Sequence, residues 1–276
     1  LENNKNKIIY DGQFQYLDIR REPVNINGEV VFKFEKGKGG NIGTKTTILV
    51  KNSIPKVIIQ TFYDKSKIPK KVYDNIKKYA PEYKHIIYND EECIEFIRKY
   101  FDKKVLDKFM SLKQGAHKAD LFRYCYLYIN GGVYLDIKTE LIKPVREIFP
   151  DNYVYLFLSA SLVPIKTHGG SIYNGIIATT AKRHIFKLLI DEIVKTPQIK
   201  LDENYLLITI QFYMILKKIL TVSPILGLNN NIYYLYEERN LDVSNCKNGL
   251  DRYSGCYFGM NKKEKIIKIR YEDYPW

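Results

Sequence analysis

The sequence predicts an α/β protein built on a mainly parallel central sheet. From about residue 54 onward, short runs rich in β-branched residues alternate with amphipathic stretches, which is typical of βαβ units. A long helical stretch at 111–130 leads through two glycines into a short apolar strand. Alternating apolar and polar residues near both ends of the chain predict β-rich N-terminal and C-terminal additions to this core.

The composition is that of a globular protein. The chain has 276 residues, enough for one large domain or two small domains with ample core. Hydrophobic residues make up 45% of it, and no run approaches the roughly 18 apolar residues of a membrane span. These values predict a soluble, cytoplasmic protein. The first residue is Leu1 rather than a methionine, so a removed N-terminal signal or anchor stays an open alternative.

The formal net charge of +13 indicates a basic surface. Such a surface can serve nucleic acid, an anionic membrane or a phosphorylated small molecule. Lysine and arginine are scattered along the whole chain instead of forming a block, so no specific nucleic-acid partner is expected. A basic, nucleic-acid-associated protein remains a minor alternative, which predicts salt-sensitive binding.

Residues 1–50 are predicted to form an N-terminal β extension outside a core domain at 51–276. Strands are expected at 15–20 and 28–35, where apolar and polar residues alternate. The glycine-rich stretch at 37–44 is expected to be a surface loop, because neither Gly-Lys-Ser/Thr nor a helix follows it. The extension can pack on the core or pair with a second subunit, so a homo-oligomer is one expectation.

The core is predicted to begin with a buried parallel strand at 57–59, a continuous β-branched run. A helix at 69–79, a strand at 85–90 and a helix at 90–100 are expected next. Beyond the central stretch, strands are expected at 154–160 and 174–179, and helices at 183–195 and 205–220. Four short strands are expected in the tail, at 221–227, 231–236, 255–260 and 265–271.

The central helix at 111–130 carries polar residues beside its apolar stripe. The predicted core face consists of Phe122, Cys125, Tyr126 and Ile129, which recur at helical spacing. Asp120 and Arg123 lie three residues apart on an adjacent face. Gly131 suits the positive φ that ends a helix, and the strand at 133–135 then places Asp136 at its carboxyl end. In open α/β sheets, ligands bind at that end of the strands.

The pattern A-x-x-A-D-x-x-R-Y-x-x-L-Y-x-x-G-G-V-Y-L-D at 116–136 resembles the donor-binding core of the DXD-containing glycosyltransferases of family 32. That family includes fungal α-1,6-mannosyltransferases and is related to clostridial glucosylating toxins. The resemblance covers about residues 54–180. It implies a GT-A-like fold and a retaining hexosyltransferase that moves a sugar from a UDP- or GDP-sugar to a glycan or protein-linked acceptor.

The resemblance also implies roles for single residues. Asp120 and Arg123 match the pair that holds the donor's sugar and ribose, and Tyr134 falls on a matching strand position. Asp136 matches the first carboxylate of the Asp-x-Asp motif, which meets the nucleotide and a divalent metal, Mn²⁺ or Mg²⁺. We therefore expect Asp136, Asp120 and Arg123 to be catalytic and Asp136 to be the metal ligand.

Two further segments resemble the same family. I-P-K-V-I-I-Q-T-F is similar to its opening strand, which implies that Thr61 and Phe62 lie near the nucleotide base, with Phe62 as a stacking face. N-G-I-I-A-T at 174–179 is similar to its N-x-x-x-x-A segment, which implies that Asn174 faces donor or acceptor. A core role for Phe62 and a turn-capping role for Asn174 are the alternatives.

Lys138 departs from the family pattern, because it stands where the second Asp of the motif is expected. Residues 136 and 138 share a face of an extended strand, so we expect Lys138 to enter the site or its edge. Three interpretations stay open. Lys138 can neutralise the diphosphate in place of a metal, Asp136 can hold a metal with help from Glu272 or Asp273, or the site can bind a sugar nucleotide or glycan without turnover.

Other residues support no second site. The pair Asp120 and Arg123 has a simpler alternative, an ion pair on the helix surface that contributes little. The cysteines at 93, 125, 246 and 256 have no metal-binding spacing, and Cys125 is predicted to be a buried thiol. The histidines at 85, 117, 168 and 184 form no metal motif, and surface or core roles are expected for them; His117 is expected to lie off the Asp120 face. No nucleophilic carboxylate is identified.

Overall fold

The computed structural model describes residues 7–10, 23–26, 29–32, 53–150, 153–159, 170–226, 232–240, 257–261, 264–271 and 273–274. Its strands are β1 Lys7–Tyr10, β2 Pro23–Ile26, β3 Glu29–Phe32, β4 Val57–Thr61, β5 Lys84–Tyr88, β6 Gly132–Leu135, β7 Glu140–Leu141, β8 Val154–Leu158, β9 Ile172–Thr179, β10 Ile232–Asn240, β11 Tyr257–Asn261 and β12 Glu264–Lys268. Its helices are the short 3₁₀ helix η1 Lys65–Lys67, then α1 Lys70–Tyr79, α2 Asp90–Tyr100, α3 Lys103–Ser111, α4 Gly115–Asn130, α5 Val145–Ile148, α7 His184–Lys195, α8 Gln198–Glu203 and α9 Leu207–Leu226.

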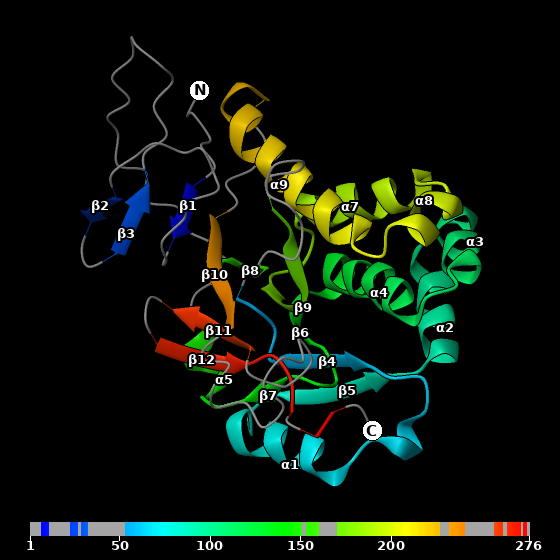
Figure 1. Cartoon of the computed structure of the whole chain (residues 1–276), viewed down its shortest axis with the longest axis horizontal. Helices are drawn as coiled ribbons and strands as arrows, with labels where there is room; N and C mark the ends of the chain where they lie inside the picture. The colour runs from blue at the N-terminus through cyan, green and yellow to red at the C-terminus, as the bar shows by residue number, and fades with distance from the viewer. Residues whose placement is uncertain are drawn as a thin grey trace.

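The described strands form one sheet in the order β2-β3-β1-β10-β8-β9-β6-β4-β5 (Figure 1). Outside this order, β11 pairs with β10, β12 pairs with β11, and β7 pairs with β12. Strands β4, β5 and β6 run parallel, as do β1, β10 and β8. Strand β9 lies antiparallel between β6 and β8. This arrangement confirms the predicted α/β class with a mainly parallel central sheet.

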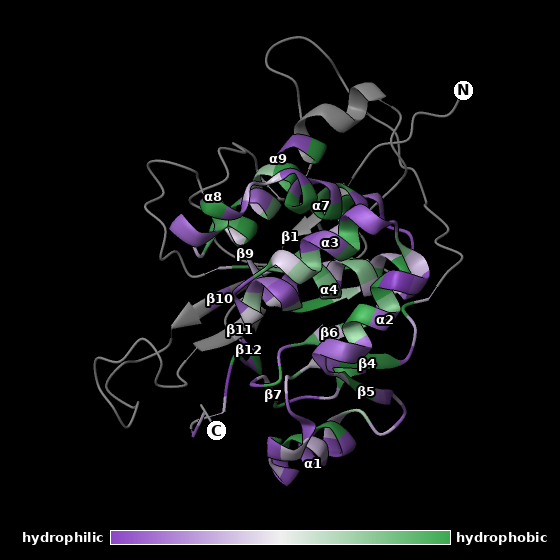
Figure 2. Ribbon diagram, turned by 90° about the vertical axis from the view of Figure 1, so that its right-hand side faces the viewer, coloured by the Kyte–Doolittle hydropathy of each residue, from purple (hydrophilic) through white to green (hydrophobic). Residues whose placement is uncertain are grey.

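Helices α2, α3, α4, α7, α8 and α9 gather on one side of the sheet, whereas α1 lies apart from them near β5 (Figure 1). The largest apolar cluster joins that helical layer to the sheet, and a second cluster lies on the opposite face under α1, α5 and β12. Figure 2 shows α1 largely hydrophilic and α4 pale to hydrophobic, as expected for an outer and an inner helix.

Capping residues set several helix boundaries. The Asn89 side chain accepts a hydrogen bond from Glu92 N–H at 2.9 Å, and the Glu92 carboxylate accepts one from Asn89 N–H at 2.8 Å. This capping box explains why β5 stops at Tyr88 and α2 begins at Asp90. Asp102 caps α3 in a similar way, through Val105 N–H.

Some predicted elements differ from the structure. The central helix begins at Gly115 rather than at 111, because a separate helix, α3, ends at Ser111. The strand predicted at 221–227 is wrong, because α9 continues to Leu226 and Pro224 lies inside its last turns. The strand predicted at 15–20 and the loop at 37–44 lie outside the described residues.

The N-terminal strand β1 pairs in parallel with β10 over Lys7 to Tyr10, so this part of the predicted extension joins the main sheet. Strand β3 lies within the predicted strand at 28–35. The boundary near residue 50 and pairing with a second subunit stay predictions. Among the described helices, none is both long enough and apolar enough to cross a membrane.

Candidate functional site

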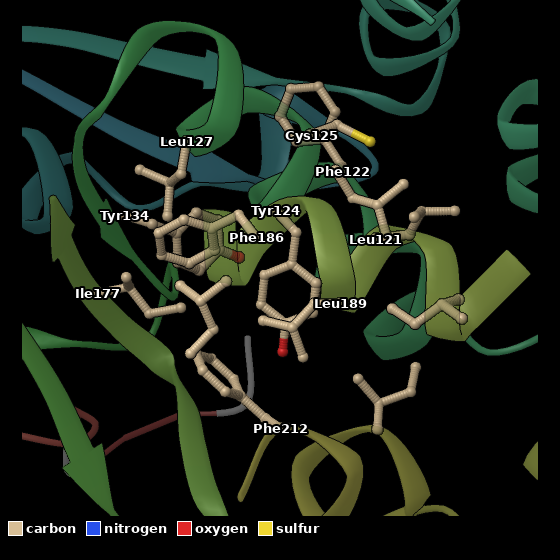
Figure 3. Close-up of a cluster of buried hydrophobic side chains, with 14 of the residues drawn as sticks. Leu121, Phe122, Tyr124, Cys125, Leu127, Tyr134, Ile177, Phe186, Leu189 and Phe212 are labelled. Atoms are coloured by element: carbon tan, nitrogen blue, oxygen red, sulfur yellow. The ribbon is translucent and has the colours of Figure 1, made fainter. Parts of the chain in front are cut away.

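Helix α4 is buried on all of its sides at its centre. Residues 120–127 are all buried. Figure 3 shows the apolar ones that it labels, such as Leu121, Tyr124 and Leu127, among side chains of β6, β9, α7 and α9. Tyr124, for example, meets the ring of Phe212 edge-on at 5.5 Å. The single core face predicted for this helix is therefore too narrow, because α7 and α9 cover the side turned away from the sheet. Its member Ile129 is only half-buried.

Asp120 and Arg123 are among these buried residues, with 7% and 4% of their surfaces exposed. An ion pair on the helix surface is therefore the wrong interpretation of their spacing. Burying a charged group is costly unless it is paired and hydrogen-bonded, so a buried carboxylate beside a buried guanidinium needs a structural or functional reason.

Two glycines lie where α4 ends and the next strand, β6, begins. Gly131 has a φ of +68°, and its N–H donates to Leu127 O at 2.9 Å, which ends α4 as predicted. A Cβ on Gly131 would lie 2.6 Å from Ala181 N, so no larger residue fits without a backbone shift. Strand β6 then pairs with β4 and β9, and Asp136 follows its last residue at the carboxyl end of the parallel strands.

Arg123 is the centre of the cluster. Its Nη2 lies 3.3 Å from Asp120 Oδ1 and 3.2 Å from Asp136 Oδ1. Its Nε donates to Ala119 O at 3.1 Å, and its Nη1 donates to Asn174 O on β9. The guanidinium carbon lies 4.1 Å from the centre of the Tyr134 ring. These contacts fix the guanidinium in one orientation between the two carboxylates.

The Asp136 carboxylate accepts hydrogen bonds from two tyrosines, Tyr134 at 3.2 Å on Oδ1 and Tyr173 at 3.3 Å on Oδ2. Lys138 Nζ lies 3.4 Å from Oδ2. Burial alone would raise the pKa of Asp136, but Arg123 and Lys138 outweigh it and hold that pKa below its usual value. Asp136 is therefore a stable carboxylate at neutral pH.

Asp120 is held differently. Burial, together with the nearby charge of Asp136, raises the pKa of Asp120 in spite of the attraction of Arg123. Its only ion pair within the described part of the chain is the one with Arg123. Arg123 lowers the pKa of both carboxylates, but burial and the charge of Asp136 outweigh it at Asp120, so the two pKa values are shifted in opposite directions. Such a pattern is common at functional sites.

Lys138 reaches Asp136 by a route other than the predicted one. Strand β6 ends at Leu135, and residues 136–139 form a turn in which Thr139 N–H donates to Asp136 O at 2.9 Å. Lys138 is therefore not on the same face of an extended strand as Asp136. The turn folds its side chain back onto the carboxylate, and Tyr271 N–H holds the Lys138 carbonyl from the C-terminal segment at 2.9 Å.

The other predicted residues fall into two groups. Thr61, the last residue of β4, joins the cluster through a 3.0 Å hydrogen bond between its Oγ1 and Tyr134 Oη. Asn174 joins it through the carbonyl that Arg123 binds. Phe62 lies apart, half-buried against an apolar cluster made of Ile68, Val72, Ile87, Ile137 and Tyr271. Its ring centre is 4.9 Å from that of Tyr63, which is exposed.

Three residues of the site were not predicted. Tyr173 binds Asp136, although no motif in the sequence marks it. Tyr124 and His117 lie on α4 next to Asp120, and the electrostatic influence of His117 reaches that carboxylate. The signal for His117 was its position, three residues before Asp120, which places it on the same helix face and not off it.

Several buried polar atoms around Asp120 have no hydrogen-bond partner among the described residues. They are the Tyr124 hydroxyl, His117 Nδ1 and both side-chain polar atoms of Asn174. Nearly all buried polar groups in proteins are hydrogen-bonded, to protein, water or ligand. Hydroxyl groups of a bound molecule are suited to satisfy such a mixed set of donors and acceptors.

A divalent cation does not fit the side chains around Asp136. Both carboxylate oxygens already accept from cations or hydroxyls, so no lone pair faces an open coordination position. In the part of the chain that the structure describes, no three His, Cys, Asp or Glu side chains are close enough to hold a metal ion. Asp273 pairs with Lys71 of α1, and Glu272 lies outside the described residues.

Residues 67–155 match the family model described as "Glycosyltransferase sugar-binding region containing DXD motif". This match contains the whole 116–136 pattern and confirms the resemblance on which the site was predicted. The chain carries this region over about a third of its length.

Known proteins show similarity to part of the chain. The initiation-specific alpha-1,6-mannosyltransferase of Candida albicans is 35% identical over 101 residues, which are 34% of this chain and 26% of that protein. Mannosyl phosphorylinositol ceramide synthase SUR1 of Saccharomyces cerevisiae is 38% identical over 87 residues, 30% of this chain and 22% of that protein. The chain thus aligns with about a quarter of the length of these fungal relatives.

A relative of broader coverage is an uncharacterized glycosyltransferase of Acanthamoeba polyphaga mimivirus, 24% identical over 50% of this chain and 53% of that protein. Among solved structures, one titled "PaToxG Glycosyltransferase" superposes with a TM-score of 0.45 and 16% identity, over 61% of this chain and 71% of that chain.

Proposed function

We propose that this chain, whose residues 67–155 carry the DXD-containing sugar-binding region of glycosyltransferases, transfers a hexose from a UDP- or GDP-sugar to a glycan or protein-linked acceptor. Mannose is the first donor sugar to test, because the names of the two fungal relatives state mannosyl transfer or mannosyl products. We place the transfer on a GT-A-like domain.

One observation carries the proposal. Buried Arg123 pairs with buried Asp120 and with partly buried Asp136 at the carboxyl end of β4 and β6, inside the matched region. A cluster of this kind is expensive to bury for stability alone, and replacing it with apolar residues is often neutral or stabilising. Its position at the carboxyl edge of parallel strands is where α/β sheets bind ligands.

We propose the following donor contacts, which the geometry supports. The sugar hydroxyls meet Asp120 and the unpartnered polar atoms of Tyr124, His117 and Asn174, which together offer acceptors and donors in one buried place. The ribose and the diphosphate lie toward Asp136 and the Lys138 turn. The base extends past Thr61 toward Phe62, which the family resemblance places near it.

We propose transfer with retention of configuration by a front-side route. The bond between the anomeric carbon and the diphosphate oxygen breaks, and its electron pair leaves with the nucleoside diphosphate. The acceptor hydroxyl oxygen bonds to the anomeric carbon on the same face, and its proton passes to the departing phosphate oxygen. This route needs no nucleophilic carboxylate, and the cations beside Asp136 stabilise the charge that develops on the leaving group.

The test is turnover of a panel of UDP- and GDP-sugars that includes GDP-mannose, measured as released nucleoside diphosphate with and without glycan acceptors. We expect one donor to be consumed, and Asp136→Asn and Asp120→Asn to reduce that turnover by about 100-fold or more. Asp107→Asn is the matched control, because Asp107 forms an exposed ion pair with Lys103 on α3. Nuclear magnetic resonance of the product gives the anomeric configuration.

A donor that binds without being consumed, with every acceptor tested, would favour the alternative of a non-catalytic sugar-nucleotide or glycan-binding protein, for which the Lys138 substitution is the motive. A homo-oligomer formed through the N-terminal strands and a cytoplasmic location also stay predictions.

A further inference from the structure

We propose that Lys138 takes the place of the divalent cation at this site, so that the nucleoside diphosphate binds and leaves without a metal. This inference rests on the proposed nucleotide-sugar function and names the group that neutralises its diphosphate.

The first step of the argument is the charge of the cluster. The described side chains at its centre are two carboxylates, Asp120 and Asp136, and two cations, Arg123 and Lys138, so their formal charges cancel. With aspartate at 138, as in an Asp-x-Asp motif, the same cluster would hold three carboxylates and one cation. That exchange changes the local formal charge by two units, which is the charge of one divalent ion.

The second step is the occupancy of Asp136. Arg123 and Tyr134 bind Oδ1, while Lys138 and Tyr173 bind Oδ2. Carboxylates that hold Mn²⁺ or Mg²⁺ offer free lone pairs at about 2.0–2.2 Å from the ion. A cation that entered here would have to displace an ammonium or a buried guanidinium, and it would meet their positive charges at close range.

The third step is the freedom of the ammonium. At 3.4 Å, the Lys138–Asp136 pair is longer than the roughly 2.7–2.9 Å of a strong charge-assisted hydrogen bond. The Lys138 side chain is 29% exposed, whereas that of Arg123 is 4% exposed. Lysine carries three donors on a flexible stem, so Lys138 can reach a phosphate oxygen beside Asp136 while Arg123 stays fixed in the cluster.

The backbone supports this position. The 136–139 turn is closed by Thr139 N–H on Asp136 O at 2.9 Å, and Tyr271 N–H binds the Lys138 carbonyl. Ile137, between the two charged residues, is buried in the apolar cluster that also contains Ile68 and Val72. The turn is thus anchored on both sides, and the ammonium is presented at the edge of the site from a defined place.

The experiment is calorimetric titration of UDP and GDP into the full chain, in EDTA and in Mn²⁺, with metal content checked by mass spectrometry after EDTA treatment. We expect one nucleotide to bind with the same affinity in both conditions. Lys138→Ala should weaken that binding about 10- to 100-fold, as loss of a hydrogen bond between charged groups does. Lys138→Asp, which rebuilds Asp-x-Asp, should make binding depend on Mn²⁺ and should bind Mn²⁺ itself, as seen by electron paramagnetic resonance.

The controls are Lys103→Ala and Lys103→Asp, because Lys103 is an exposed lysine that also pairs with an aspartate, Asp107. Neither should change nucleotide affinity or bind Mn²⁺. Equal effects of the substitutions at 103 and 138 would overturn the assignment to Lys138.

The wild-type titrations decide the proposal even if a Lys138 variant fails to fold. Binding of the wild-type chain that falls at least tenfold in EDTA would overturn metal independence and leave the proposed transferase function intact. Absence of UDP and GDP binding in both conditions would overturn the inference together with the proposed function.

Discussion

Replacing Arg123 with methionine should destabilise the chain strongly, because it leaves buried Asp120 and partly buried Asp136 without their shared cation. Arg123 lies 3.3 Å from Asp120 Oδ1 and 3.2 Å from Asp136 Oδ1. With an effective dielectric constant of about 20, each pair gains roughly 5 kcal/mol of Coulomb energy, which offsets the cost of burying the charges. Removing one partner of a buried pair typically costs about 3–5 kcal/mol, and we expect Arg123→Met to lower the unfolding free energy by that amount.

The measurement is urea unfolding followed by circular dichroism at neutral pH. Lys103→Met is the matched control, because the Lys103 side chain is 84% exposed and its pair with Asp107 faces solvent. The double variant Arg123→Met, Asp136→Asn should recover about 1–3 kcal/mol relative to Arg123→Met, since it neutralises one of the stranded carboxylates. A loss of no more than about 1 kcal/mol in Arg123→Met, or no recovery in the double variant, would refute the reasoning.

Three further outcomes are expected. Gly175→Ala should abolish donor turnover, because its Cβ would lie 2.5 Å from Asp136 Oδ2. Gly115→Ala is the control and should leave turnover unchanged, because the space around its Cβ is open. Equal activities of the two variants would contradict the proposed role of the space beside Asp136. Asp120→Asn should lose turnover, yet its unfolding free energy at pH 7 should match or exceed that of the wild-type chain. The reason is that a carboxyl group with a raised pKa favours folding only while it is protonated. A clear loss of stability would contradict the raised pKa of Asp120. Burial lowers the pKa of His85 from 6.5 to about 4, so the wild-type chain should lose stability as pH falls from 6.5 toward 4. His85→Asn should lose less stability over that range, measured as the urea midpoint at pH 6.5 and at pH 4. Identical pH profiles of the two proteins would show that His85 is not the cause.

Much of the fold could be predicted because its signals are local. Helix α2 coincides with the predicted range, and β4, β6, β8 and β9 contain or lie within one or two residues of their predicted ranges. Asp136 and Thr61 lie at the same edge of the sheet, at the carboxyl ends of parallel strands, where ligands bind in α/β proteins. The elements and the place of Asp136 needed only periodicity and glycine positions, whereas the role of Thr61 was implied by the family resemblance.

The environment of α4 could not be read from its own sequence. Helical periodicity assumes one covered face and one wet face, whereas α7 and α9, which follow more than fifty residues later, cover the second side. Arg123 is covered instead by the sheet, through Tyr134 of β6 and the Asn174 carbonyl of β9. A pattern that resembles a surface ion pair is therefore an internal one.

The geometry of Lys138 shows a second limit. A spacing of two residues places side chains on one face of a strand, but a tight turn can bring the same two residues together. The strand was predicted to end at Leu135, as it does, but D-I-K-T contains neither glycine nor proline, so no local signal indicated a turn at 136–139. Tyr173 was missed for a related reason, since its role depends on β9 lying antiparallel beside β6.

The hydrogen bond from Tyr271 N–H to the Lys138 carbonyl links the last part of the chain to the site. Free-energy coupling between two places is reciprocal, so a nucleotide that orders the 136–139 turn must also favour the docked form of the C-terminal segment. The amide of Tyr271 therefore reports on events at the diphosphate without contacting it. Exchange of this amide hydrogen with deuterium should slow when UDP or GDP binds. Hydrogen exchange in the C-terminal segment can therefore be used to follow nucleotide binding without a label.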